Sequence, residues 1–309
     1  MTDAPDKTAA GAGQGGAGTP ADLWRMGPAS ASVLVAGADP LLPFLPYFLG
    51  GWDLRWAGGE RDAAPDIRPD VEVVDGGDGT MRVVGRGPGG ADFAFDNPYD
   101  AANGLAGALI GAFVTRLPDT ICIHAAAAQV GDGLVVLLGE SHAGKSSVAL
   151  QLAVLGNRFY GDDQIAVRLC SPPEGLCLGL MPKVRTPLPD DCGEPFREFV
   201  DEYTAMECDG MVYLKLWDRE AGSFGETAPV RALVFLDRAG DSPAELLPAG
   251  RAELVRAMVE TAFAPHLGSE ALVAGLTRLA AEADVRRLRF SSSREAAALL
   301  SRIYGRSAR

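Results

Sequence analysis

Short runs of β-branched residues predict strands in the first hundred residues of the chain. Such runs lie at residues 32–36, 71–74 and 81–84, between turns rich in glycine, aspartate and proline. The Gly-Gly-Asp-Gly sequence at 76–79 separates two of these runs and predicts a hairpin turn. We therefore expect a small β-rich N-terminal module over residues 21–100.

After residue 100 the pattern changes to an alternation of helices and strands. Apolar residues spaced four apart predict a helix over residues 101–117. A strand is expected at 120–129, and the all-apolar run at 134–138 is typical of a strand buried on both faces. Further elements are expected in the order helix 146–155, strand 165–169, strand 230–236, and helices 251–263, 268–281 and 294–304. This order predicts an α/β domain over residues 101–309.

Composition narrows the functional classes. The net charge of −13 argues against binding to nucleic acid or to an anionic membrane, which needs a basic surface. There is no apolar stretch of about 20 residues, as a membrane span would need, and no secretion signal is recognisable, so a cytoplasmic location is expected. The five cysteines form no CxxC pair, which favours reduced thiols. Residues 1–20 contain little to bury and are expected to be a disordered tail.

One motif indicates chemistry. The sequence from Gly139 to Ser146 fits G-x-x-x-x-G-K-[ST], with a predicted buried strand before it and a predicted helix after it. In that context the backbone N–H groups of the loop and the helix N-terminus attract phosphate. Lys145 is expected to meet the β- and γ-phosphates and Ser146 to ligate Mg²⁺. The predicted nucleotide-binding residues are Gly139, Glu140, Ser141, His142, Ala143, Gly144, Lys145, Ser146 and Ser147.

A pair of carboxylates and a histidine complete the predicted site. Asp162 and Asp163 follow the predicted helix and could bind Mg²⁺ or accept a proton from an attacking hydroxyl, although alone they would be read as a solvated turn. His124 lies on the strand expected beside the phosphate-binding strand, where its imidazole could assist proton transfer near the phosphate, although taken alone a core histidine is the favoured interpretation. Lys183 and Arg185 could bind phosphate or acceptor, and could equally be surface cations.

These pieces, in this order, resemble the HPr kinase family of bacterial P-loop serine kinases. The resemblance rests on Ile-His-Ala around His124, on the loop from Gly139 to Ser146, and on Gly-Asp-Asp at 161–163. It covers residues 118–170 well and continues loosely toward the C-terminus. It implies a P-loop core like that of phosphoenolpyruvate carboxykinase, with the aspartates as general base and metal ligands and His124 near the phosphate. The family also tends to assemble, so a homo-oligomer is one expectation.

The chain departs from the family pattern at two places. His142 stands where the family usually has glycine, and the family's Arg-Gly signature loop is not recognisable between Pro187 and Val230. Phosphorylase activity is therefore not carried over. The pattern is closer to the shorter HPr-kinase-like proteins, some of which modify precursors of ribosomal peptides such as lasso peptides.

The hypothesis from the sequence is an ATP-dependent, Mg²⁺-dependent kinase. It would transfer the γ-phosphoryl group to a hydroxyl, expected to be a serine of a peptide or small protein. Two alternatives stay open: a small-molecule kinase on the same core, and a nucleotide-binding regulatory module without transfer activity. Nothing in the sequence identifies the acceptor.

Overall fold

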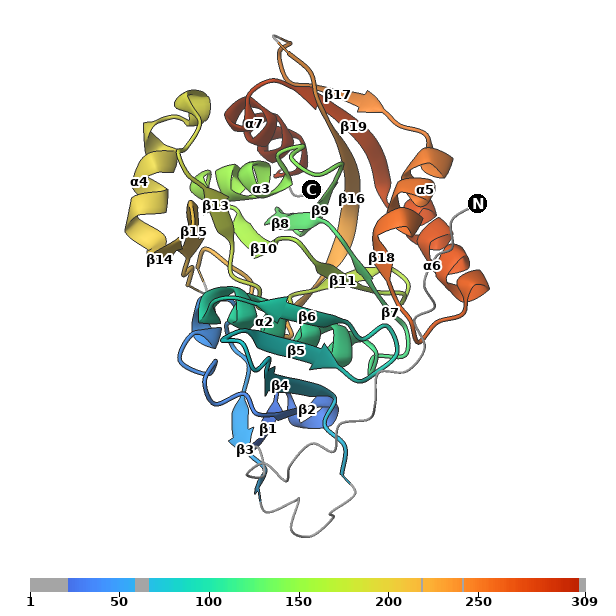
Figure 1. The fold of residues 1–309 in the computed structure, drawn as a ribbon. Helices are drawn as coiled ribbons and strands as arrows, with labels where there is room; N and C mark the ends of the chain where they lie inside the picture. The colour runs from blue at the N-terminus through green and yellow to red at the C-terminus, as the bar shows by residue number, and fades with distance from the viewer. Residues whose placement is uncertain (1–21, 59–66, 218, 241, 306–309) are drawn as a thin grey trace, which may run out of the picture.

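The β-branched runs of the first hundred residues form a six-stranded sheet with the order β3-β1-β2-β4-β5-β6 (Figure 1). In this computed structural model, residues 22–58, 67–217, 219–240 and 242–305 are described, so the tail expected at 1–20 lies outside the described residues. The three predicted strands and the β4–β5 hairpin are confirmed. The strands are β1 (Leu23–Met26), β2 (Val33–Ala36), β3 (Leu54–Trp56), β4 (Val71–Asp75), β5 (Met81–Gly85) and β6 (Asp92–Phe95).

Helix α2 (Pro98–Val114) packs on this sheet and joins it to the rest of the chain. The Asn97 side chain caps the helix by accepting a hydrogen bond from the backbone N–H of Asp100 at 2.9 Å. The apolar side of α2 is buried in one cluster with residues of the first sheet and with Cys122 and Ala166, which belong to a second sheet. The helix begins and ends three residues earlier than predicted, and it lies between two sheets (Figure 1).

The second sheet has ten strands and carries the predicted α/β pattern. Its main path is β10-β8-β9-β16-β12-β11-β7-β18, with β19 beside β16 and β17 beside β19. Strands β9, β16 and β19 are parallel to one another. The bounds are β7 (Thr120–Ile123), β8 (Ala126–Val130), β9 (Gly133–Leu138), β10 (Arg158–Gly161), β11 (Ile165–Arg168), β12 (Glu174–Leu176), β16 (Thr227–Arg238), β17 (Glu245–Pro248), β18 (Ala262–Phe263) and β19 (Asp284–Phe290).

Helices cover both faces of this sheet. Val135 and Leu137 of β9 are buried in one apolar cluster with α3 (Lys145–Val154) and α7 (Ser293–Tyr304). Val136 and Leu138 belong to another cluster, with α5 (Arg251–Thr261) and α6 (Ser269–Glu282). Successive side chains of β9 point to opposite faces of the sheet, and helices cover both faces (Figure 1). Both sets of side chains are therefore buried, which explains why β9 is apolar throughout.

The predicted single strand at 120–129 is wrong. The chain leaves the strand direction at His124, so β7 pairs with β11 and β18 whereas β8 pairs with β9 and β10. The backbone N–H of His124 donates to the carbonyl of Thr261 at 3.3 Å, which is where the break occurs. Of β7 and β8, it is β8 that pairs with β9, the strand that leads into the glycine-rich loop.

A small third sheet, β13-β15-β14, stands beside the second one together with α4 (Glu194–Tyr203). Its strands are β13 (Lys183–Arg185), β14 (Thr204–Cys208) and β15 (Met211–Leu214). Short 3-10 turns lie at Ala29–Ala31, Leu45–Tyr47 and Asp190–Cys192. Within the described residues, no helix is long and apolar enough to cross a membrane.

Candidate functional site

The glycine-rich loop connects β9 to α3 at the carboxyl end of β9. Gly139 and Gly144 have φ values of +151° and +94°, which favour glycine and let the loop turn back over the helix N-terminus. His142 has φ +66°, a left-handed conformation that glycine adopts without penalty. The backbone therefore has the conformation that a loop with glycine at this position would adopt, although the residue here is histidine.

Lys145 begins α3 and points back to the loop rather than into solvent. Only 8% of its surface is exposed, and its ammonium donates hydrogen bonds to the carbonyls of Gly139 at 3.0 Å and Glu140 at 3.1 Å. Burial lowers the pKa of Lys145, while the negative charges of Asp162 and Asp163 oppose that shift. A buried cation therefore lies beneath the loop, where it can meet an anion.

Asp162 lies at the end of β10, directly beside the first turn of α3. Its Oδ1 accepts hydrogen bonds from the Ser146 hydroxyl at 2.8 Å and from the backbone N–H of Asp163 at 2.9 Å. The residue is 3% exposed, and its Oδ2 has no hydrogen-bond partner among the described residues. Burial raises the pKa of Asp162 to about 6, although the hydrogen bond from Ser146 acts in the opposite direction.

Asp163 faces a different environment. It has φ +67°, which turns the chain between β10 and β11 and separates its side chain from that of Asp162. Its Oδ2 accepts from the Lys183 ammonium at 2.5 Å, and its Oδ1 lies 3.6 Å from Nδ1 of His124. Burial alone would raise the pKa of Asp163, but the charge and hydrogen bond of Lys183 lower it below its ordinary value.

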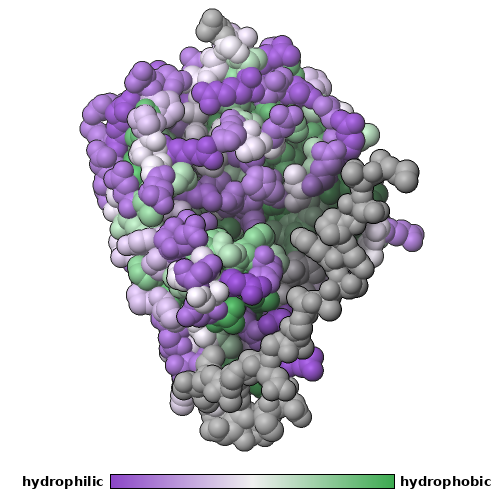
Figure 2. All heavy atoms as spheres, viewed as in Figure 1, coloured by the Kyte–Doolittle hydropathy of each residue, from purple (hydrophilic) through white to green (hydrophobic). Residues whose placement is uncertain are grey.

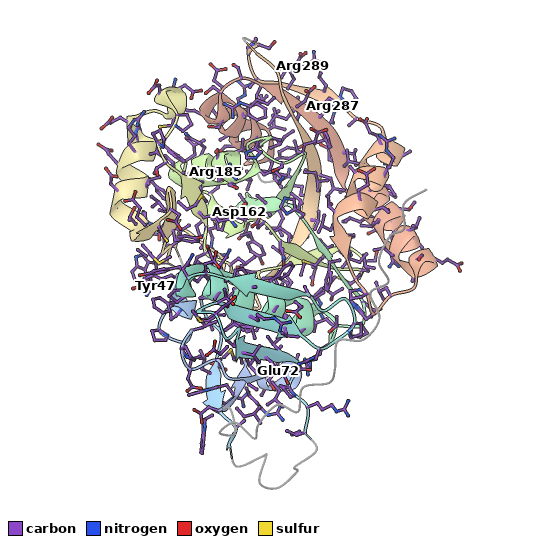
Figure 3. The ribbon with its side chains drawn as sticks, in the orientation of Figure 1. Tyr47, Glu72, Asp162, Arg185, Arg287 and Arg289 are labelled. Carbon is purple, nitrogen blue, oxygen red and sulfur yellow. The ribbon has the colours of Figure 1, made fainter. Side chains whose placement is uncertain are left out.

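The cleft in front of these groups has a volume of about 530 Å³. Lys183 and Arg185, both on β13, form one wall, and Arg185 Nη1 donates to Nδ1 of His142 at 3.1 Å. Figure 3 shows Asp162 and Arg185 near one another in the upper half of the molecule. Apart from Glu140, Gly139 and Ala143, the predicted site residues line this cleft: His124, Ser141, His142, Gly144, Lys145, Ser146, Ser147, Asp162, Asp163, Lys183 and Arg185.

The sequence analysis missed a further cation at this cleft. Arg238 ends β16, which runs parallel to β9, and its side chain lines the cavity beside the loop with no hydrogen bond or ion pair to the described residues. Ligands of open α/β sheets bind beyond the carboxyl ends of the parallel strands. The apolar run at 230–236 predicts a strand, and Arg238 lies two residues after its end, where such ligand-binding residues are expected.

The donor set fits a hard cation. Ser146 supplies a hydroxyl and Asp162 a buried carboxylate oxygen that otherwise lacks a partner, and Mg²⁺ prefers oxygen ligands of this kind. Among the described residues no cluster of three histidine, cysteine, aspartate or glutamate side chains could hold a metal. A magnesium ion here would therefore complete its shell with water and with oxygens of a phosphate ligand, as this ion usually does.

Comparisons with known proteins add little to this geometry. The chain matches no protein-family model and no curated protein. Among solved structures it is similar to the Hpr(Ser) kinase/phosphatase from Coxiella burnetii, with 13% sequence identity and a TM-score of 0.29. That match covers 59% of this chain and 92% of the other. So distant a likeness carries no chemistry, which has to follow from the residues of the cleft.

Proposed function

We propose that this chain is an ATP-dependent kinase that transfers the γ-phosphoryl group to a hydroxyl group, with a serine of a peptide or small protein as the acceptor. One arrangement supports the proposal above the others. A buried carboxylate bonded to the serine of a Gly-Lys-Ser loop stands next to a second carboxylate that faces the cleft. A loop that only bound nucleotide would need the first of these groups and not the second.

The residues divide the work by position. The N–H groups of residues 139–147 and the Lys145 ammonium bind the phosphates of ATP and neutralise their charge. Ser146 and Asp162 would hold Mg²⁺, which would neutralise charge on the β- and γ-phosphates. Arg185 and Arg238 both line the cleft, where guanidinium groups can orient the transferred group.

Asp163 acts on the acceptor. Its carboxylate faces the cleft, Lys183 donates a hydrogen bond to its Oδ2, and Nδ1 of His124 lies 3.6 Å from its Oδ1. The acceptor hydroxyl donates its hydrogen to Asp163 as its oxygen bonds to the γ-phosphorus. The bond from that phosphorus to the β,γ-bridging oxygen breaks, ADP leaves with the bonding electrons, and the proton remains on the carboxylate until it passes to solvent.

Substitution of Lys145 tests the proposal. Lys145→Ala should weaken Mg·ATP binding in calorimetry by at least about tenfold, because a buried charge-assisted contact is lost. Lys215→Ala is the matched control, since this lysine lies outside the cleft. Unchanged affinity and unchanged phosphoryl transfer in Lys145→Ala would contradict the assignment. ATP binding without transfer to any hydroxyl would favour the regulatory alternative.

A further inference from the structure

Besides the phosphate cleft, the described residues form a groove of about 650 Å³ beside α2, which is larger than the cleft. Its floor is one side of that helix, where Gly104, Gly107 and Gly111 follow one another at helical spacing. The opposite wall is the β5–β6 hairpin with its glycine-rich turn at 87–90. Figure 2 shows apolar surface in this part of the molecule, below a largely hydrophilic upper half.

Aromatic rings limit the groove at both ends of this glycine floor. The ring of Phe95 packs against the backbone at Gly104, where a Cβ atom would come within 2.3 Å of it. The ring of Phe263 lies 3.6 Å from the place of a Cβ atom on Gly111. A Cβ atom on Gly107 would meet nothing within 4 Å. The space between the two rings is therefore open above bare helix backbone.

The groove carries almost no net charge. Its two charged lining residues, Asp70 and Arg116, form an ion pair with each other at 2.8 Å. The remaining polar lining consists of neutral side chains and backbone groups. An uncharged segment fits these surroundings, whereas a charged segment would lose hydration without gaining a partner.

The rim of the groove is an edge strand. Among the described strands β6 pairs with β5 alone, so one row of its backbone N–H and C=O groups is unpaired. Phe93 on this strand is 57% exposed, although it is a large apolar residue. Extended peptides add to such edges through backbone hydrogen bonds while their side chains enter the neighbouring pocket. These features favour a polypeptide over a small molecule.

Residues that line the groove are close in the chain to residues that line the phosphate cleft. Gln164 lines the groove and directly follows Asp163, which lines the cleft. On the other side, Phe263 lies opposite Cys122 in the β7–β18 pair, and His124 follows at the end of β7. A chain lying in the groove would thus arrive at the cleft beside the two residues that face the acceptor.

We propose that this groove is the acceptor-binding site, and that it takes an extended, uncharged, apolar segment of a polypeptide next to the residue that is phosphorylated. The inference rests on the proposed kinase function and specifies its substrate. The segment adds to β6 by backbone hydrogen bonds, and its apolar side chains lie between Phe95 and Phe263. The hydroxyl-bearing residue then lies at Asp163.

Gly107 offers a substitution that fills the groove without disturbing the fold. Gly107→Leu places a side chain in open space and replaces a helical glycine by a stronger helix former. Gly107→Ala is the matched control, because it makes a similar helix change but adds one carbon. Phe93→Ala has its own control in Trp56→Ala, which removes an exposed aromatic from β3 at the other edge of the same sheet.

The probe is a library of peptides that each hold one central serine between either uncharged apolar or charged flanks, with Mg·ATP. The wild-type chain should prefer uncharged apolar flanks. Gly107→Leu should lower kcat/KM for these peptides by about tenfold or more, and Phe93→Ala should lower it as well. Gly107→Ala and Trp56→Ala should stay near wild type. Mg·ATP affinity by calorimetry should remain within about twofold in all four variants, because none of them lines the cleft.

Each other outcome overturns the inference. Wild-type kcat/KM in Gly107→Leu, or a preference for charged flanks, would show that the acceptor lies elsewhere. If the chain binds Mg·ATP but phosphorylates no peptide of the library, the groove is not an acceptor site, and a small-molecule kinase becomes the favoured function. If the chain does not bind Mg·ATP at all, the proposed function has failed first, which calorimetry on the wild type shows separately.

Discussion

Asp162 and Asp163 are neighbours in the chain, yet their surroundings move their pKa values in opposite directions. Asp162 is buried against Ser146, and Asp163 faces the cleft between Lys183 and His124. Positive φ at Asp163 is what separates the two side chains. Sequence spacing alone left the metal ligand and the base unassigned, because the turn conformation is not readable from Gly-Asp-Asp.

We expect substitutions of the two aspartates to affect different steps of the reaction. Asp163→Asn should lower the rate of phosphoryl transfer by about 10²–10⁴-fold, because the amide cannot take the acceptor proton. Its Mg·ATP affinity should change little. Asp162→Asn should instead shift the Mg²⁺ dependence of the reaction to higher concentration, because a charged ligand is lost. Transfer assays under Mg²⁺ titration separate the two, and full transfer activity in both variants would reduce the pair to a solvated turn.

Asp162 also makes a prediction about stability and pH. Its folded-state pKa of about 6 lies above the ordinary 3.8, so the folded chain holds this proton more tightly than the unfolded chain. The resulting stabilisation is fully present below pH 3.8 and is lost as the pH rises through 6. At about 1.4 kcal/mol per pKa unit, the loss amounts to roughly 3 kcal/mol above pH 7. Above pH 7 the ionised Asp162 carboxylate therefore lowers the free energy of unfolding of the metal-free protein.

Urea unfolding of Asp162→Asn and wild type at pH 4.5 and 7.5, without metal, checks this. The variant should gain free energy of unfolding relative to wild type as the pH rises, because asparagine does not ionise. Asp163→Asn is the control, since the lowered pKa of Asp163 gives a contribution that is present above the unfolded-state pKa of 3.8, so its difference from wild type should stay nearly constant between pH 4.5 and 7.5. A variant-to-wild-type difference for Asp162→Asn that does not change with pH would contradict the assigned burial.

At the scale of elements, the glycine-rich loop depends on one residue in an unfavourable conformation. His142 holds φ +66° where glycine is the natural choice, and its ring accepts from Arg185 on β13. His142→Gly should preserve Mg·ATP binding, because glycine adopts this backbone without penalty. His142→Val should weaken binding, because a β-branched side chain is a genuine outlier at positive φ. Calorimetry measures the Mg·ATP affinity of both variants. Equal affinities would show that binding does not depend on the backbone preference of the residue at this position.

The sequence predicted elements best where apolar pattern and local turn signals agreed. The buried strand β9, the loop and α3 follow directly from Leu-Val-Val-Leu-Leu and the Gly-Lys-Ser signature. It missed β19, because the charged residues of Asp-Val-Arg-Arg-Leu-Arg-Phe hide a strand whose arginines pair with Asp237 and Glu253. The break at His124 was also missed, since it is set by a partner 137 positions away, the carbonyl of Thr261.

The candidate site shows the same division. The loop, both aspartates and His124 were named from local motifs, and the structure brings them to one cleft. For Lys183 the sequence left a binding role and an ordinary surface cation equally open, because its ion pair with Asp163 joins residues 20 positions apart. Arg238 was not named, since its place depends on β16 running parallel to β9. Tertiary pairing, rather than residue type, decides these positions.

At the scale of the whole molecule, the N-terminal sheet is joined to the segment that leads into the cleft. The backbone N–H of Gly50 donates to Gly179, and that of Met181 donates to Phe48, at 2.8 and 2.9 Å. Two residues after Met181 the chain enters β13 at Lys183, the partner of Asp163. The first sheet therefore supports a wall of the cleft as well as the groove.

Trp52 fastens this junction. Its indole N–H donates to the carbonyl of Leu178 at 2.9 Å, and its ring packs against Phe113 of α2 and against Phe224. Only 7% of its surface is exposed. One side chain thus connects the N-terminal part and α2 with the segments that follow β12 and precede β16 of the second sheet. This predicts that the chain unfolds as one cooperative unit rather than as two domains in sequence.

Trp52→Ala should therefore lower the free energy of unfolding by about 3–5 kcal/mol, the usual loss for a large buried aromatic. Trp52→Phe should cost less than Trp52→Ala, because an aromatic ring remains, although the smaller phenyl ring fills less of the buried space and the hydrogen bond to Leu178 is lost. Trp56→Ala, an exposed residue of the same sheet, should change stability by no more than about 0.5 kcal/mol. Urea unfolding followed by circular dichroism and by fluorescence should give one coincident transition for the wild type. If two transitions are resolved and Trp52→Ala moves only the first, the N-terminal sheet is an independent domain, and its support of the Lys183 wall would have to be abandoned.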